Sequence, residues 1–237
     1  LHSPHAAAAP AATVPASLEP LRSLTNRHLG TIRTELGSFS RLGSGYGLEW
    51  LLPEKKFDLA RLMASSEGTL GIITRATLQL VADAPVKQMV ALGYASMAEA
   101  ADAMPALARF SPTAAEGLDR RIVEVVARRG GTVPDLPRGD GWVFIELVGE
   151  QADEVRDRAE ALRQASGALE AWLVEDSATA TALWKIRSDG AGLAGVSLER
   201  PAFPGWEDAA VPVEQLGTYL RRFEELLQRH GLHALPY

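Results

Sequence analysis

The sequence predicts an α+β fold built from ferredoxin-like units. Two observations support this prediction. After residue 85, short strand-like runs, in which every second residue is apolar, alternate with runs of helical periodicity. The strand-like runs are also too short for a wide, doubly wound sheet. Periodicity alone leaves a parallel α/β sheet as the alternative.

The first 85 residues divide into a tail and a helical part. Residues 1–17 are rich in Ala and Pro and have no periodic apolar face, so we expect a flexible segment. Ser17 can cap a helix that ends at Gly37. The elements expected after this helix are a glycine-rich loop at 43–47, a helix at about 56–64, a glycine turn followed by a strand that ends at Val81, and a domain boundary at 83–85.

The second predicted domain, residues 86–237, alternates strands with helices. Its strongest strand pattern is the apolar run at 142–148. The other strands are expected near 86–94 and at 113–118, 169–174 and 208–212, and the helices at 96–109, 119–128, 151–166, 177–189 and 213–230.

The composition excludes several classes of function. The net charge of −6 is spread without long runs, so there is no basic surface for nucleic acid. The chain has no cysteine, which rules out a disulfide, an iron–sulfur cluster or a cysteinyl flavin within it. No apolar run approaches the ~20 residues of a membrane span, and residues 1–17 do not resemble a signal peptide. The default expectation is a cytoplasmic protein.

The most informative motif is a glycine turn at residues 65–74, Ser-Ser-Glu-Gly-Thr-Leu-Gly-Ile-Ile-Thr. Gly68 and Gly71 lack a Cβ, so the main chain can adopt positive φ there and a ligand can approach its N–H groups. This chemistry suits a pyrophosphate, although the strand-then-helix order of a dinucleotide fingerprint is missing. For an isolated Gly-x-x-Gly, a glycine-capped helix that turns into a strand is the more common explanation.

Four motifs in order resemble one family. They are Gly-Tyr-Gly-Leu at 45–48, Glu-Gly-Thr-Leu-Gly-Ile-Ile-Thr at 67–74, Leu-Trp-Lys-Ile-Arg at 183–187 and Trp-Glu-Asp-Ala-Ala-Val-Pro at 206–212. Together they are similar to the FAD-linked oxidases of the vanillyl-alcohol oxidase superfamily. The resemblance is greatest to the branch of D-lactate dehydrogenases and the glycolate oxidase flavin subunit.

This resemblance implies a domain organisation and a cofactor. Residues 18–85 would be the C-terminal part of a PCMH-type FAD-binding domain, and residues 86–237 a ferredoxin-like α+β cap that binds substrate. The likeness therefore favours α+β over the parallel sheet. The residues expected to bind FAD are Tyr46, Glu67, Gly68, Thr69, Leu70, Gly71, Ile72 and Ile73. Tyr46 has an alternative interpretation as a core aromatic that fixes a turn.

The resemblance also implies substrate contacts. Arg187 matches an arginine that pairs with the substrate carboxylate, whereas periodicity alone favours a solvent-facing or helix-terminal arginine. Asp208 is preferred to its neighbour Glu207 as a second contact, because adjacent side chains on a strand point to opposite faces. Solvation at a sheet edge is an equal alternative for Asp208.

No metal site is expected in this chain. His230 and His233 superficially resemble a metal-binding pair, but His230 is expected to end a helix and His233 to begin a strand after Gly231. The family's first FAD-binding half and its metal-associated histidines would lie outside these 237 residues. We therefore expect an internal piece of a larger flavoenzyme, with the catalytic base unassigned.

The function expected from the resemblance is the FAD-dependent oxidation of a small 2-hydroxy acid such as D-lactate or glycolate. An electron-acceptor protein or a fused redox domain is the expected partner for reoxidation. Two alternatives remain: a non-catalytic, cap-like interaction module, and a flavin-dependent transferase similar to alkyl ether lipid synthases.

Overall fold

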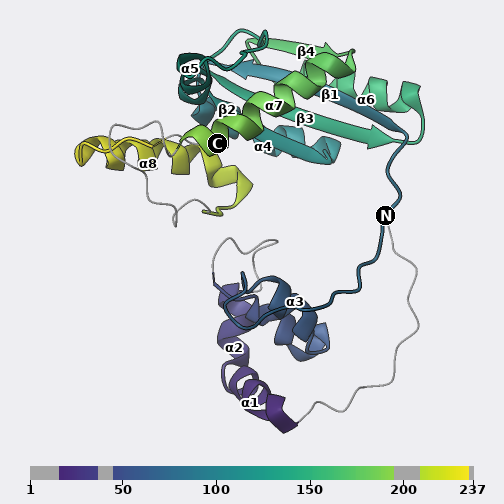
Figure 1. The fold of residues 1–237 in the computed structure, drawn as a ribbon, viewed down its shortest axis with the longest axis vertical. Coiled ribbons are helices and arrows are strands. Elements are labelled where there is room, and N and C mark those ends of the chain that lie inside the picture. The colour runs from purple at the N-terminus through teal and green to yellow at the C-terminus, as the bar shows by residue number, and fades with distance from the viewer. Residues whose placement is uncertain (1–15, 37–44, 195–208, 235–237) are drawn as a thin grey trace. The chain divides into compact units, whose positions relative to one another are not determined.

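The computed structural model describes residues 16–36, 45–194 and 209–234, and these form two compact units (Figure 1). The first unit contains the described residues up to Leu78, and the second contains nearly all of the rest. Each unit is described by itself.

The first unit is a small helical assembly. Its helices are α1 (Glu19–Arg27), α2 (Leu29–Thr31) and α3 (Leu59–Ala64), with a π-helical turn over Ile32–Leu36 and short 3₁₀ turns at Ala16–Leu18, Leu48–Leu51 and Pro53–Lys55. The helix predicted from Ser17 to Gly37 is therefore interrupted, because His28 leaves helical geometry with φ −109° and ψ 19°. The buried apolar residues of this unit are Ile32, Leu51, Leu52 and Leu62.

Polar contacts fix two of these turns. Asp58 caps α3, where its side chain accepts a hydrogen bond from the Arg61 backbone N–H at 3.1 Å. Arg33 donates to both oxygens of Glu54, at 2.7 and 2.8 Å. These hydrogen bonds lower the pKa of Glu54 to about 2.

The strand predicted after the glycine turn is wrong. Residues 71–84 form no helix or strand, and Ile72 and Leu80 are 92% and 89% exposed. A strand is held by hydrogen bonds to a neighbouring strand, and no strand among the described residues pairs with this segment. Alternating apolar residues predict the local conformation, but they do not supply the partner.

The second unit is built on a four-stranded sheet with the order β2-β3-β1-β4. Its strands are β1 (Val86–Tyr94), β2 (Ala114–Asp119), β3 (Gly141–Gly149) and β4 (Glu170–Val174). Every neighbouring pair is antiparallel, with Val90 opposite Ile145 between β1 and β3. This is the strand order of the split βαβ units of ferredoxin-like folds. The α+β prediction is therefore confirmed, and the parallel sheet is excluded.

Helices cover both faces of this sheet (Figure 1). The apolar side chains of α4 (Met97–Leu107) and α6 (Ala152–Ala165) pack on one face, against Val90 and Leu92 among others. Those of α5 (Arg120–Arg128) and α7 (Ser177–Ala194) pack on the other, against Ala91 and Phe144. Alternation along each strand supplies both cores, because successive side chains point to opposite faces.

The last described helix, α8 (Leu216–Arg229), packs against α4. A Cβ added at Gly217 would overlap the side chain of Asp102, so the absence of a side chain permits the close approach. Arg221 of α8 donates to both oxygens of Asp102, at 2.7 and 3.0 Å, and this lowers the pKa of Asp102. The strand predicted at 208–212 is wrong over residues 209–212, which are irregular, and residue 208 lies outside the described residues.

Candidate functional site

The glycine turn folds as a tight reversal over Ser66 to Thr69. The Thr69 N–H donates to the Ser66 carbonyl at 2.9 Å, and the two central residues, Glu67 and Gly68, have φ values of 49° and 75°. Two central residues with positive φ are typical of a type I′ turn. Gly68 therefore has the predicted left-handed conformation, whereas Gly71 is not among the residues with positive φ.

The Gly-Tyr-Gly-Leu motif lies directly against this turn. The Tyr46 hydroxyl is 2.9 Å from the Thr69 hydroxyl, and the Gly47 N–H donates to Ser65 Oγ at 3.1 Å. A Cβ at Gly47 would lie only 2.7 Å from the same Ser65 oxygen. The structure thus brings together two motifs about twenty residues apart in the sequence. Tyr46 is 41% exposed, so the core-aromatic interpretation is wrong.

The turn presents features that fit the phosphate groups of FAD. Among the residues that the structure describes, no carbonyl accepts the backbone N–H groups of residues 70–73. Nothing lies within 4 Å of a Cβ built on Gly68. Exposed backbone donors beside an open glycine can approach phosphate oxygens closely. The side chains of Leu70, Ile72 and Ile73 are exposed as well, and they offer apolar contact area.

Arg187 lies in the second unit, on α7, beside the edge strand β2. Its Nη2 donates to Glu116 Oε2 at 2.8 Å, and its side chain is only 21% exposed. The solvent-facing interpretation of this arginine is therefore wrong. The pair lines a cavity of about 480 Å³. The residues that line this cavity, called here the Arg187 pocket, are Glu116, Thr181, Trp184, Lys185, Arg187, Ser188 and Asp189.

The position of the pocket follows from the helical repeat of α7. Leu183 and Ile186 are buried against the sheet, and Trp184 makes an edge-on contact with Phe144, with ring centroids 6.3 Å apart. Arg187 follows Leu183 by one helical turn, so it emerges at the edge of this buried face. Core packing therefore sets the place of the guanidinium.

Sequence reasoning missed Glu116. A signal was present, because Glu116 lies two residues before Leu118 in a predicted strand, and residues two apart in a strand share a sheet face. A charged residue on the core-facing side of a strand requires a partner, and here the partner is Arg187. The predicted substrate contact Asp208 lies outside the described residues.

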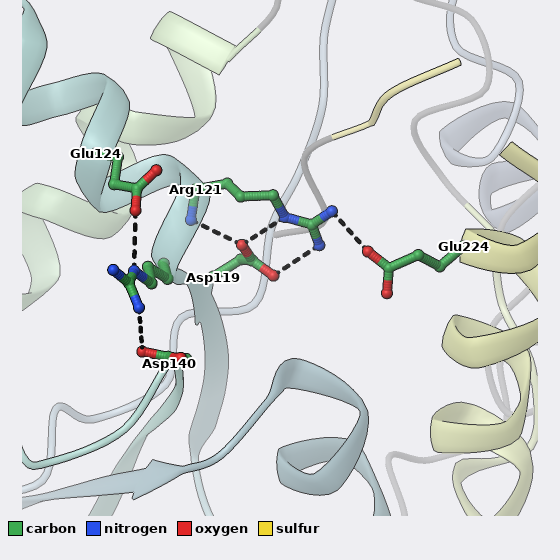
Figure 2. Close-up of polar contacts among 6 residues, drawn as sticks. Asp119, Arg121, Glu124, Asp140 and Glu224 are labelled. Carbon is green, nitrogen blue, oxygen red and sulfur yellow. Dashed lines mark hydrogen bonds and ion pairs between the residues drawn. The ribbon is translucent and has the colours of Figure 1, made fainter. Parts of the chain in front are cut away.

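A second polar cluster lies where β2 leads into α5, beside α8 (Figure 2). Asp119 and Arg121 form an ion pair, and Arg121 also contacts Glu224 of α8 at 2.8 Å. The hydrogen bond from Arg121 to Asp119 raises the pKa of Arg121, while partial burial opposes this shift. Acidic and basic side chains here neutralise one another, and together they line a cavity of about 410 Å³.

His230 is the C-cap residue of α8, as predicted from its place in the sequence. Across residues 16–36, 45–194 and 209–234, no three His, Cys, Asp or Glu side chains gather as a metal site. In the same parts of the chain, none of the helices has the length and apolar character needed to cross a membrane.

Comparison with known proteins adds two findings. Residues 84–237 match the family model described as FAD linked oxidases, C-terminal domain. The chain is 27% identical over 182 residues to a D-lactate dehydrogenase of Archaeoglobus fulgidus, covering 76% of this chain and 39% of that protein.

Other relatives carry a different name. D-2-hydroxyglutarate dehydrogenases of Pseudomonas putida and Escherichia coli are 28% and 25% identical to this chain, over 228 and 214 residues. These matches cover 89% and 81% of this chain but only 23% and 21% of the relatives. The chain thus spans between about a fifth and two fifths of the length of these relatives.

Proposed function

Because the chain belongs to the family of FAD linked oxidases through their C-terminal domain, we propose that it serves in the FAD-dependent oxidation of a small 2-hydroxy acid. Two kinds of support agree. The relatives are named D-lactate and D-2-hydroxyglutarate dehydrogenases, and both of these acids carry a hydroxyl next to a carboxylate. In the second unit, the half-buried Arg187 lines a pocket where its guanidinium can bind a carboxylate.

The Arg187 pocket is the observation that carries the proposal. A guanidinium presents parallel N–H donors that match the two oxygens of a carboxylate. Arg187 would hold the substrate carboxylate in this way and so orient the carbon that is oxidised. Asp208 stays a proposed second substrate contact.

In the first unit, the proposed FAD-binding residues are Tyr46 and residues 67–73. The N–H groups of residues 70–73 would donate to phosphate oxygens, and the open left-handed turn at Gly68 would allow the close approach. The hydroxyl pair of Tyr46 and Thr69 would hold this turn in shape. When bound, FAD supplies the redox chemistry by accepting the two electrons and the hydrogen removed from the substrate.

The test is an anaerobic absorption spectrum of the full-length, FAD-loaded protein that contains this chain, before and after addition of D-lactate or D-2-hydroxyglutarate. We expect loss of the visible flavin absorption with at least one D-acid and none with the matching L-acid. A protein that takes up FAD but is reduced by no 2-hydroxy acid would refute the substrate class. A protein that takes up no FAD would indicate the non-catalytic module instead.

A further inference from the structure

We propose that Glu116 makes the Arg187 pocket select 2-hydroxy acids with a single carboxylate over those with two. This inference rests on the proposed function, since it assumes that Arg187 binds a substrate carboxylate. It addresses the point at which the relatives differ, because one is named for a monocarboxylate and the others for a dicarboxylate.

The first step is the place of Glu116. Its Oε2 lies 2.8 Å from Arg187 Nη2, on the wall of the pocket. Its backbone is held in β2, where Glu116 pairs with Phe144 of β3, and Phe144 is fully buried. The Glu116 side chain is 41% exposed, and the ion pair places its charge beside the guanidinium. A substrate carboxylate on Arg187 therefore has Glu116 as a neighbour.

The second step is the charge of the pocket. Its described lining contains two acidic residues, Glu116 and Asp189, and two basic residues, Lys185 and Arg187. Each base already has an acidic partner, because Lys185 Nζ is 2.6 Å from Asp189 Oδ2. The lining is thus neutral, and a second substrate carboxylate would enter it with no unmatched positive charge among these residues.

The third step is the strength of these charges. Lys185 and Asp189 are 69% and 47% exposed, so solvent screens their contribution. Glu116 is 41% exposed and is screened as well, but it lies 2.8 Å from Arg187, which is proposed to hold the first carboxylate. The short carbon chain of a small dicarboxylate keeps its second carboxylate near the first, and the wall that surrounds Arg187 carries Glu116 and Asp189. Removal of the Glu116 charge should therefore favour the dicarboxylate specifically.

The experiment is calorimetric titration of the 237-residue chain with D-lactate and with D-2-hydroxyglutarate. We expect the wild type to prefer D-lactate. Glu116→Gln removes the carboxylate that competes for Arg187, so both acids should bind more tightly, but the dicarboxylate should gain about threefold more than D-lactate. Glu175→Gln is the matched control: it removes the same charge from an exposed pair with Arg156, outside the pocket, and should leave the ratio unchanged.

The outcomes separate this inference from the proposed function. Equal gains for both acids in Glu116→Gln, with D-lactate binding still lost in Arg187→Ala, would refute the selectivity and leave the clamp intact. If the wild type did not bind D-lactate, or if Arg187→Ala bound it as tightly as the wild type does, the proposed binding of the substrate carboxylate by Arg187 would be refuted. Circular dichroism checks the fold of each variant. As a second measure, Glu116→Asp keeps the charge and should keep the preference for D-lactate.

Discussion

Asp119 binds Arg121 through both of its carboxylate oxygens and at the same time caps the helix that contains Arg121. Asp119 Oδ1 accepts from the backbone N–H and from Nε of Arg121, each at 2.8 Å, and Oδ2 accepts from Nη2 at 2.8 Å. The Asp119 side chain is 8% exposed. Because Arg121 also contacts Glu224, this one carboxylate links the end of β2, the start of α5 and helix α8 (Figure 2).

Replacement of Asp119 by Ala should lower the free energy of unfolding by about 2–3 kcal/mol, because a helix cap and charge-assisted hydrogen bonds are lost together. Urea denaturation checks this value. The matched control is Asp140→Asn, which breaks the exposed contact between Asp140 and Arg120 and should have no measurable effect. Equal effects of the two substitutions would show that the Asp119 contacts add nothing beyond surface charge.

Tyr94 should make the stability fall at high pH. Burial raises its pKa to about 12, while its hydrogen bond to the Ser166 carbonyl, at 2.9 Å, opposes the shift. The folded state therefore holds the phenolic proton more tightly than the unfolded state. This contribution is complete below about pH 10, the ordinary tyrosine pKa, and is lost as the pH rises toward 12.

Between these pH values, the free energy of unfolding should fall by up to about 1.4 kcal/mol per pH unit from this group. Tyr94→Phe should remove this part of the slope and lower stability at pH 7 by about 1 kcal/mol through the lost hydrogen bond. Tyr219→Phe, which removes the hydroxyl of a partly exposed tyrosine, is the control. The same slope in Tyr94→Phe and wild type would contradict the prediction. Guanidinium denaturation at a series of pH values measures it.

Most of the second unit could be predicted from the sequence because each element carries its own periodicity. The strands predicted at 86–94 and 142–148 match β1 and the interior of β3, and the helix predicted at 151–166 matches α6. The antiparallel order could not be derived from periodicity, because an alternating run does not specify its neighbour. The family resemblance supplied that step.

The errors have a shared physical cause, which is dependence on a partner. The run that ends at Val81 has a strand pattern but no strand to pair with among the described residues. Glu116 was missed because its importance depends on Arg187, which lies 71 residues later in the chain. The turn at Gly68 was predictable, since only local chemistry is required.

Gly68→Val should reduce FAD binding more than Gly71→Val does. A branched side chain at φ 75° is strained, whereas Gly71 is outside the left-handed region and a Cβ there would meet only Met63 Cε, at 3.3 Å. A terminal methyl group of methionine can move aside. Flavin content after purification of the FAD-loaded protein measures the difference. Equal flavin content in both variants and wild type would remove the support for the glycine turn as the FAD site.

Arg187→Ala should lower kcat/KM for the 2-hydroxy acid by about one to four orders of magnitude. The estimate follows from the loss of one or two hydrogen bonds to a charged group, each worth about 1.5–3 kcal/mol. Arg187→Lys keeps the charge but loses the planar fork, so its kcat/KM should lie between those of Arg187→Ala and wild type. Flavin content should not change, since the proposed FAD-binding residues are in the other unit.

The control for this experiment is Arg156→Ala, which removes an arginine that is 64% exposed and paired with Glu175 outside the pocket. Its kcat/KM should equal that of wild type, so any loss in Arg187→Ala can be assigned to position rather than to charge. Stopped-flow reduction of the flavin at subsaturating substrate gives the rate directly. If Arg187→Ala were reduced as fast as wild type, Arg187 would serve structural contacts such as its ion pair with Glu116, and the carboxylate would bind elsewhere.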